Sequence, residues 1–256
     1  MEVLKSYTIE LAPTLSQHWY NVWRTIKENQ KSEFVGVFPS STTILNAYPQ
    51  SAHLTRWIAE KGWNEAQQIK SEAGERGTAI HKGIEHLLDG HELRQGYMIP
   101  GNNRPIGLEE YWKLSTFVTW YKEYAPEVLE KEVRVFSLDG GYAGTFDCLA
   151  NIYDQLTVID WKSSSAIHEH FALQVASYAH AIEENTDLEV IQTACLQLGA
   201  QNKNGYRFVV YPNWREHYKV FEHVKATWQY ENYDSKVKEK GPPVLDLPDV
   251  LKLDMK

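Results

Sequence analysis

Two acidic residues and a lysine stand out in the middle of the chain. Asp147 lies in the segment YAGTFDCLANIY (142–153), and Asp160 and Lys162 lie in the next segment, QLTVIDWKSS (155–164). Both segments have the composition and the period of two that predict successive β-strands. The second begins like the interior of a sheet and then carries an acid and a base two residues apart, which core packing alone does not explain.

The two predicted strands bring these charges together. Side chains alternate faces along a strand, so Asp160 and Lys162 share one face, while Ile159 and Trp161 point to the other. If the strands pair through a short link at 154–155, the residue numbers of opposite partners sum to about 309. Asp147 then lies opposite residue 162 and within a residue or two of Asp160.

Two carboxylates this close repel each other unless a positive charge lies between them. A Mg²⁺ ion, or Mn²⁺ in its place, prefers oxygen ligands and meets that need. An ammonium beside such an ion positions or polarises a metal-bound water, and the hydroxide formed from it attacks a phosphodiester. The residues Asp147, Asp160 and Lys162 therefore indicate metal-dependent phosphodiester hydrolysis.

Charge and cysteine content limit the class of protein. The chain has 256 residues and a formal net charge of −8, which argues against broad nonspecific nucleic-acid binding but allows a local basic groove. Cys148 and Cys195 form no CxxC pair, so a disulfide framework, a zinc ribbon and a four-cysteine iron–sulfur cluster are not expected. The sequence has no GxxxxGK[ST] phosphate loop and therefore no helicase or ATPase motor of that kind.

The sequence has no apolar run long enough to span a membrane, and its opening segment does not read as a signal peptide. With only two cysteines, this pattern indicates a water-soluble protein of a reducing compartment without a membrane partner. We expect the cytoplasm of a bacterium or of a phage-infected cell, by analogy of size and composition.

The first part of the chain combines strands and helices. Short strands are predicted at 18–24 and 33–38, and Pro39, Ser40 and Ser41 precede an apolar run, which is a helix-start signal. Helices are predicted at 51–60, 63–89 and 108–125, the last closed by Pro126. The second has an apolar stripe at helical spacing and a stop at Gly90; the stripe is Ala79, Ile80, Gly83, Ile84, Leu87 and Leu88.

From residue 126 the period changes from 3.6 to 2, and a three-strand meander is predicted with a tight turn at Asp139-Gly140-Gly141. The order of elements that follows predicts an α/β domain with a mixed central sheet flanked by helices. The predicted elements are strands 128–138, 142–153 and 155–164, helix 170–185, strands 190–199 and 206–212, and helix 214–231. The expected units are an N-terminal strand and helical region (1–125), a core (126–240) and an extended tail (241–256) with three prolines.

An acid on one hairpin strand followed by Asp-x-Lys on the next resembles the PD-(D/E)XK nuclease superfamily. The matching segments are Gly144-Thr145-Phe146-Asp147 and Asp160-Trp161-Lys162, with Phe146 where the family name has proline. The resemblance implies a restriction-endonuclease-like core with an N-terminal helical extension. It also implies that Asp147, Asp160 and the main-chain carbonyl of Trp161 bind Mg²⁺ or Mn²⁺, while Lys162 orients the attacking water.

Further segments, in the same order along the chain, resemble the RecB-like, phage-type exonuclease branch. His81 in GTAIH (77–81) corresponds to a metal-binding histidine on an upstream helix, and Gln174 and Tyr178 match the QxxxY motif on the helix after the lysine. Gln174 and Tyr178 share a helical face, where both reach DNA or the lysine. Glu132 matches an acid of the first meander strand, and segment 39–45 with Arg56-Trp57 is similar to exonucleases of the mitochondrial genome maintenance type.

Several of these assignments keep an alternative. Glu85 lies one turn after His81 and is the other candidate for the helix-borne ligand. Tyr178 borders an apolar stripe and also suits a packing role, and Glu132 has Glu130 beside it on the same predicted face.

The predicted function is a metal-dependent exonuclease acting on single-stranded DNA or on DNA with free ends, in recombination, repair or replication, with a recombination or replication protein as a possible partner. A DNA channel is expected on the helices around His81, because cations contact phosphates and aromatic rings stack on bases; its residues are Arg56, Trp57, Lys70, Arg76 and Lys82. The alternatives are a non-cleaving DNA-binding protein on the same scaffold and a structure- or site-specific endonuclease.

Overall fold

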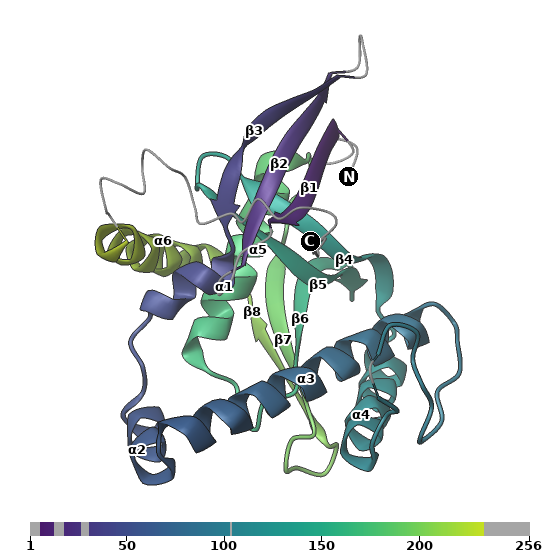
Figure 1. The fold of residues 1–256 in the computed structure, drawn as a ribbon. Helices are drawn as coiled ribbons and strands as arrows, with labels where there is room; N and C mark the ends of the chain where they lie inside the picture. The colour runs from purple at the N-terminus through teal and green to yellow at the C-terminus, as the bar shows by residue number, and fades with distance from the viewer. Residues whose placement is uncertain (1–5, 13–17, 27–30, 103, 233–256) are drawn as a thin grey trace, which may run out of the picture.

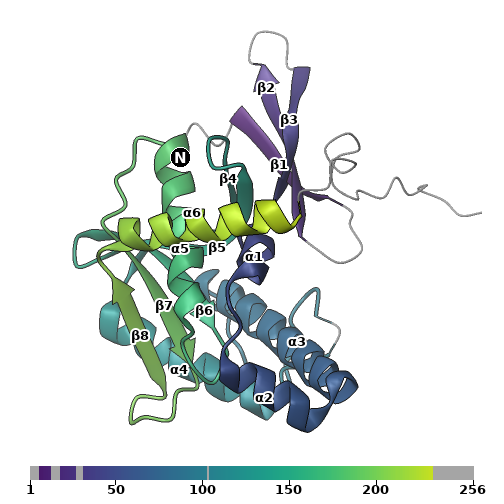
Figure 2. The same cartoon turned by 90° about the vertical axis from the view of Figure 1, so that its left-hand side faces the viewer.

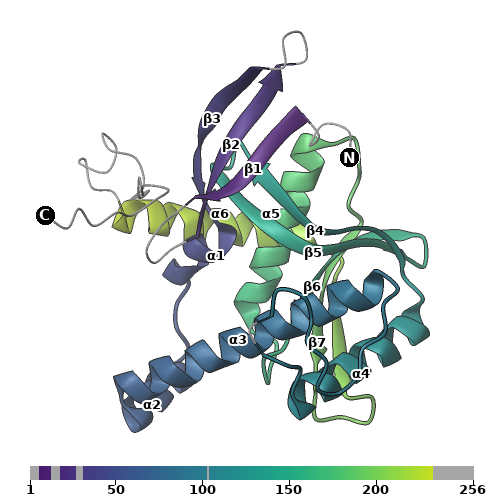
Figure 3. The same cartoon turned by 45° about the vertical axis from the view of Figure 1, so that its right-hand side comes forward.

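The computed structural model describes residues 6–12, 18–26, 31–102 and 104–232. The predicted tail, 241–256, lies outside these residues. In all three ribbon views, a small N-terminal sheet and a group of helices occupy opposite ends of the molecule, with a larger sheet between them (Figures 1, 2 and 3). None of the helices in these ranges has the length and apolar character that a membrane span requires.

The larger sheet has five strands in the order β4-β5-β6-β7-β8. The β6–β7 pair is parallel and the other pairs are antiparallel, because helix α5 connects β6 to β7 while short links join the rest. This mixed sheet flanked by helices confirms the predicted α/β fold class. The strands are β4 (Glu127–Ser137), β5 (Tyr142–Ile152), β6 (Gln155–Lys162), β7 (Gln192–Leu198) and β8 (Tyr206–Tyr211), and α5 is Glu169–Asn185.

The N-terminal sheet is antiparallel, with the order β1-β2-β3. Strands β2 (Trp19–Ile26) and β3 (Lys31–Pro39) correspond to the two predicted strands, whereas β1 (Tyr7–Ala12) was not predicted as a separate strand. Arg134 of β4 donates a hydrogen bond to the carbonyl of Ile9 at 2.9 Å, which ties this sheet to the larger one.

The remaining helices are α1 (Ser41–Ile44), the short 3-10 turn η2 (Leu45–Ala47), α2 (Ala52–Lys61), α3 (Trp63–Leu88), α4 (Leu108–Tyr124) and α6 (Trp214–Glu231). Helix α1 begins where the sequence predicts, with the Ser40 hydroxyl accepting a hydrogen bond from the Thr43 amide. Helix α3 runs for about 39 Å. It ends at the predicted stop, where Gly90 has a φ of 81° and the amides of Gly90 and His91 donate to the carbonyls of Leu87 and His86.

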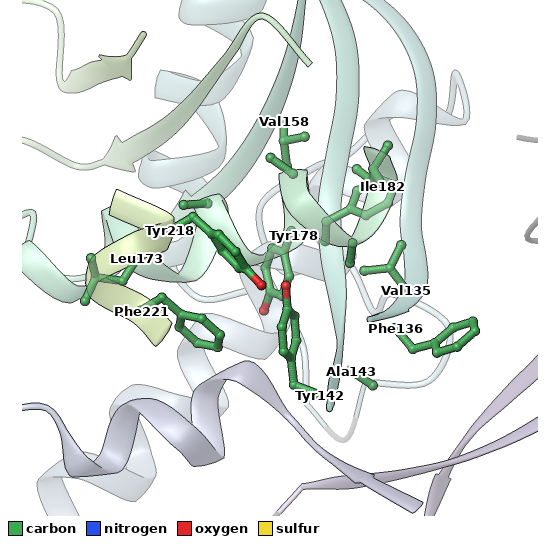
Figure 4. Close-up of a cluster of buried hydrophobic side chains, with 14 of the residues drawn as sticks. Val135, Phe136, Tyr142, Ala143, Val158, Leu173, Tyr178, Ile182, Tyr218 and Phe221 are labelled. Carbon is green, nitrogen blue, oxygen red and sulfur yellow. The ribbon is translucent and has the colours of Figure 1, made fainter. Parts of the chain in front are cut away.

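The central sheet is buried on both faces. On one face, side chains of β4 to β6 pack against α5 and α6, and Figure 4 shows Val158 of β6, Ile182 of α5 and Phe221 of α6 in this interior. On the other face, Trp161 of β6 packs edge-on against Trp120 of α4, with ring centroids 5.6 Å apart. The two helical layers thereby fix the strands from which the charged residues project.

The hairpin between β5 and β6 corrects the predicted register. The turn is formed by Tyr153 and Asp154, with φ values of 52° and 62°, and not by residues 154–155. Two consecutive positive φ values are typical of a type I′ turn, which suits the twist of a two-residue hairpin. Cys148 therefore pairs with Ile159, and the next position along brings Asp147 against Asp160 and not against residue 162. The predicted proximity of Asp147 and Asp160 holds.

Candidate active site

Strands β5 and β6 separate just beyond the Cys148–Ile159 pair, and Asp147 occupies the point of separation. Its Oδ2 accepts a hydrogen bond from the main-chain amide of Trp161 at 2.6 Å. The side chain thus takes the place of a backbone partner, and it is buried. This contact fixes one carboxylate oxygen against β6 and leaves the other, Oδ1, facing α3.

His81 reaches this point from α3. Its Nδ1 lies 3.3 Å from Oδ1 of Asp147, and its Nε2 lies 3.1 Å from the carbonyl oxygen of Trp161. The helix comes this near because Gly77, one turn earlier, has no side chain: a Cβ there would lie 3.3 Å from Oγ of Ser163. One imidazole therefore contacts two of the three oxygen donors that the sequence resemblance assigns to a metal, those of Asp147 and Trp161.

Glu132 joins them from β4. The pairs Lys131–Cys148 and Val133–Phe146 place Glu132 opposite Asp147. Its φ of 50° departs from strand geometry and follows a β-bulge near Val128. Ligand atoms of His81, Glu132 and Asp147 all lie within 4.8 Å of one another.

Asp160 and Lys162 both belong to β6 and lie on its α5 side. Nζ of Lys162 is 2.6 Å from Oδ2 of Asp160 and donates a hydrogen bond to Oε1 of Gln174 at 2.9 Å. The Gln174 amide in turn donates to Oδ1 of Asp160 at 3.3 Å and to the Tyr178 hydroxyl at 2.9 Å. These contacts form one buried polar network, and Asp160 lies outside the closest group of three ligands among the described residues.

Tyr178 occupies a space that a glycine provides. A Cβ at Gly144 would lie 2.4 Å from the Tyr178 ring, so the glycine of the Gly-Thr-Phe-Asp segment is needed for the ring to pack there. The ring belongs to the core shown in Figure 4, while the hydroxyl accepts from Gln174. Tyr178 therefore packs in the core and also contacts the polar network of the site.

Burial and nearby charges shift the pKa values of Glu132, Asp160 and His81. Burial and the nearby charge of Asp147 raise the pKa of Glu132 to about 7. Burial also raises the pKa of Asp160 to about 6, because the attraction of Lys162 only partly offsets it. For His81, burial works to lower the pKa, but the charge and hydrogen bond of Asp147, with Asp160 and Glu132 behind it, raise it to about 9. At neutral pH His81 is therefore a cation held among acids.

These features fit a divalent cation. Carboxylate oxygens, an imidazole nitrogen and a main-chain carbonyl are suitable donors for Mg²⁺ or Mn²⁺. Buried Oδ2 of Asp160 accepts no hydrogen bond of ordinary angle within the described ranges, although Nζ of Lys162 lies 2.6 Å away. Burial, together with the charge of Asp147, raises the pKa values of Glu132 and Asp160, so a bound cation would favour the charged form of both carboxylates.

A hollow of about 510 Å³ opens on the outer side of His81. It is lined by Gly74, Gly77, Thr78, His81, Lys82, Glu85 and Glu132. Glu85 is exposed and lines this hollow without joining the group of three ligands, so the geometry favours His81 over Glu85 as the helix-borne ligand.

The five residues expected to contact DNA lie on α2 and α3 at different distances from this hollow. Lys82 lines it and donates a hydrogen bond to the carbonyl of Gly101. Arg76 lies 3.9 Å from Glu109 of α4, which partly neutralises it. Arg56, Trp57 and Lys70 lie farther along, on α2 and the first half of α3, where Arg56 and Lys70 are exposed.

Two contacts that the sequence did not suggest fix the segment after β6. Lys113 of α4 donates a hydrogen bond to the carbonyl of Ser163 at 2.9 Å, and the buried amide of Gln197 donates to the carbonyl of Ser164 at 3.1 Å. The sequence could not indicate these contacts, because both side chains bind main-chain carbonyls of a segment that is distant in the sequence. Together they set where the backbone leaves Lys162.

No protein-family model and no curated protein sequence matches the chain. Among solved structures, the chain is similar to one described as SSO0001, with 13% identity, a TM-score of 0.37, and coverage of 80% of this chain and 86% of that one. It is also similar to the alkaline exonuclease LHK-Exo from Laribacter hongkongensis, with 9% identity, a TM-score of 0.31, and coverage of 80% and 95%. Both likenesses are distant, and the function proposed below rests on the side chains of the site.

Proposed function

We propose that the chain is a metal-dependent DNA exonuclease of the PD-(D/E)XK type, in its RecB-like branch, which hydrolyses phosphodiester bonds from DNA ends. The observation that supports this best is the convergence of two acids, a histidine and a lysine from three separate elements, α3, β5 and β6. A fold that needed these charges only for stability would not bury Asp160, whose pKa burial and the nearby charge of Asp147 raise to about 6, beside a second carboxylate.

In this proposal His81, Asp147, Asp160 and the carbonyl of Trp161 hold the metal, with Glu132 as a further candidate. Bound Mg²⁺ or Mn²⁺ supplies a Lewis acid that lowers the pKa of water and neutralises charge on the phosphate. Burial works against the charge of Lys162, but the carboxylate of Asp160 outweighs it and raises the lysine's pKa, so its ammonium stays charged. It orients the attacking water.

Gln174 supports both charged groups of this pair. Its carbonyl oxygen accepts from Lys162, and its amide donates to Asp160 and to Tyr178, so neither charged side chain can rotate without breaking a buried hydrogen bond. The DNA would approach from the helices α2 and α3, whose exposed cations contact phosphates. We also propose that the chain acts in recombination, repair or replication, together with a protein partner of such a pathway.

The test compares linear DNA, labelled at its 5′ or 3′ end, with closed circular DNA, in Mg²⁺, in Mn²⁺ and in EDTA. We expect metal-dependent digestion of the linear substrates and an intact circle. Asp160→Ala should abolish digestion, whereas Asp187→Ala, an exposed acid in the loop after α5, should leave it unchanged. Digestion of linear DNA by folded Asp160→Ala protein contradicts the site assignment, and cleavage of the circle contradicts the exonuclease assignment.

A further inference from the structure

Four aromatic side chains gather where α5 begins. His168 and His170 stack with nearly parallel rings, 5.7 Å between centroids and 8° between planes. Phe171 meets both of them edge-on, at 5.2 Å and 4.7 Å. Tyr48, which follows the 3-10 turn η2 far away in the sequence, lies 5.9 Å from His170. The cluster thus joins the end of the N-terminal segment to the start of the helix that carries Gln174.

This ring cluster touches the reactive end of the site. Nζ of Lys162 lies 4.3 Å from the centroid of Phe171, over the face of the ring. The same ammonium lies 2.6 Å from Asp160. A phosphate held at Lys162 would therefore leave its own nucleoside, or the next one along the strand, within reach of the rings.

Helix formation does not account for the two histidines. His168 occupies the N-cap position of α5, where serine, threonine, aspartate or asparagine normally accepts an amide hydrogen bond, and its side chain makes no such bond. Neither imidazole makes a hydrogen bond or an ion pair with another residue in the described part of the chain. His168 is exposed and His170 is partly exposed, so both rings are accessible to solvent beside a charged lysine.

We propose that Tyr48, His168, His170 and Phe171 form a platform on which bases of single-stranded DNA stack as the strand enters the site. The inference rests on the proposed function and adds to it a preference for an unpaired end. Every base has a flat face, so stacking of this kind tolerates any sequence. It also suits a protein with a net charge of −8, which cannot rely on overall charge to hold a strand.

The charge state of His170 supports stacking over phosphate binding. Burial, followed by the proximity of His168 and Lys162, lowers the pKa of His170 to about 4. The imidazole of His170 is therefore neutral at neutral pH and offers a ring face and not a cation. Its contribution to binding should depend little on salt, in contrast to that of Lys82 or Arg76.

The test measures binding of two oligonucleotides of equal length and charge, one with bases and one abasic, in Ca²⁺ or EDTA to limit cleavage. The wild-type chain should bind the strand with bases more tightly, and the double variant His168→Ala/His170→Ala should lose most of that difference, on the order of tenfold. The variant His168→Phe/His170→Phe keeps flat rings and should retain it. His223→Ala, on the exposed face of α6, is the matched control.

Each outcome decides between the two proposals. The stacking proposal is wrong if the wild-type chain digests linear DNA but binds both oligonucleotides equally. It is also wrong if the alanine variant keeps the full difference in binding. Neither result contradicts the proposed nuclease function. Wild-type protein that neither binds nor digests DNA overturns the proposed function itself. If the alanine variant unfolds, the phenylalanine variant still decides, because loss of base-dependent binding there contradicts stacking.

Discussion

Oε1 of Gln174 accepts a hydrogen bond from Nζ of Lys162 at 2.9 Å, in the interior between β6 and α5. The same amide group donates to Asp160, so one uncharged side chain holds an acid and a base of the site in fixed relation. A glutamine can do this because its carbonyl and its NH₂ have opposite hydrogen-bonding roles.

Gln174→Ala is expected to lower kcat by about 10- to 100-fold, the scale typical of residues that orient metal ligands. The loss should appear in kcat and in the pH profile of the reaction, with little change in KM. Gln192→Ala is the matched control, since Gln192 is an equally buried glutamine whose amide donates to Thr157 at a distance from the site. Equal loss of activity in both variants would mean that Gln174 stabilises the fold and does not position Lys162 and Asp160.

Metal affinity is expected to rise with pH. A proton on His81, whose pKa is about 9, must leave before its nitrogen can bind a cation, so each unit from pH 6.5 to 8.5 should tighten Mn²⁺ binding by up to about tenfold. Calorimetric titration at three pH values measures this, and His81→Asn should flatten the dependence. Affinity independent of pH across the range in the wild-type chain would contradict the role of His81.

Without metal, the free energy of unfolding should decrease as the pH rises, because of the same histidine. Its pKa is raised above the usual 6.5, so its contribution is full below pH 6.5 and is lost as pH rises through about 9. Thermal unfolding of the metal-free chain at pH 6.5, 8 and 9.5 measures the decline. His81→Asn should decline less over this interval, and an unchanged slope in that variant would contradict the assignment.

Glu132→Gln is expected to stabilise the metal-free chain at pH 8. The pKa of Glu132 is raised to about 7, so its charge becomes a penalty as pH rises from 4.5 to 7 and stays one above that. The substitution should raise Tm at pH 8, leave it unchanged near pH 4, and weaken metal binding by about tenfold. Glu130→Gln, on the same strand, should neither raise Tm at pH 8 nor weaken metal binding. A stabilising effect of equal size in that variant would contradict the argument.

Glycine substitutions at two positions should have opposite effects. Gly144→Ala forces the Tyr178 ring from its place and should cost about 1–3 kcal/mol of unfolding free energy. Gly74→Ala meets no atom within 4 Å and lies inside α3, so it should gain about 1 kcal/mol from helix propensity. Urea unfolding measures both, and two changes of the same sign would contradict the packing argument.

Local patterns predicted the arrangement of the side chains wherever the backbone is regular. The period of two placed Asp160 and Lys162 on one face, and Ile159 and Trp161 are indeed in the opposite core. The helical spacing of four residues placed Gln174 beside Tyr178, and the two are hydrogen-bonded.

Prediction failed where the backbone leaves regular geometry. The type I′ turn at Tyr153 and Asp154 moves the strand pairing by two from the predicted sum, because turn type and not residue count sets the register. Glu132, which the sequence offered only as a supporting acid, has a positive φ and lies 3.9 Å from His81. Neither feature is visible in a pattern of polar and apolar residues.

The position of His81 against β6 depends on how many residues separate it from Gly83 in α3. Gly83 sets where this helix rests on α4, since a Cβ there would lie 2.7 Å from Leu114. One residue inserted between Gly83 and His81 would turn the imidazole by about 100° around the axis and move it by about 1.5 Å. The chain would then keep every side chain of the site and still lose its geometry.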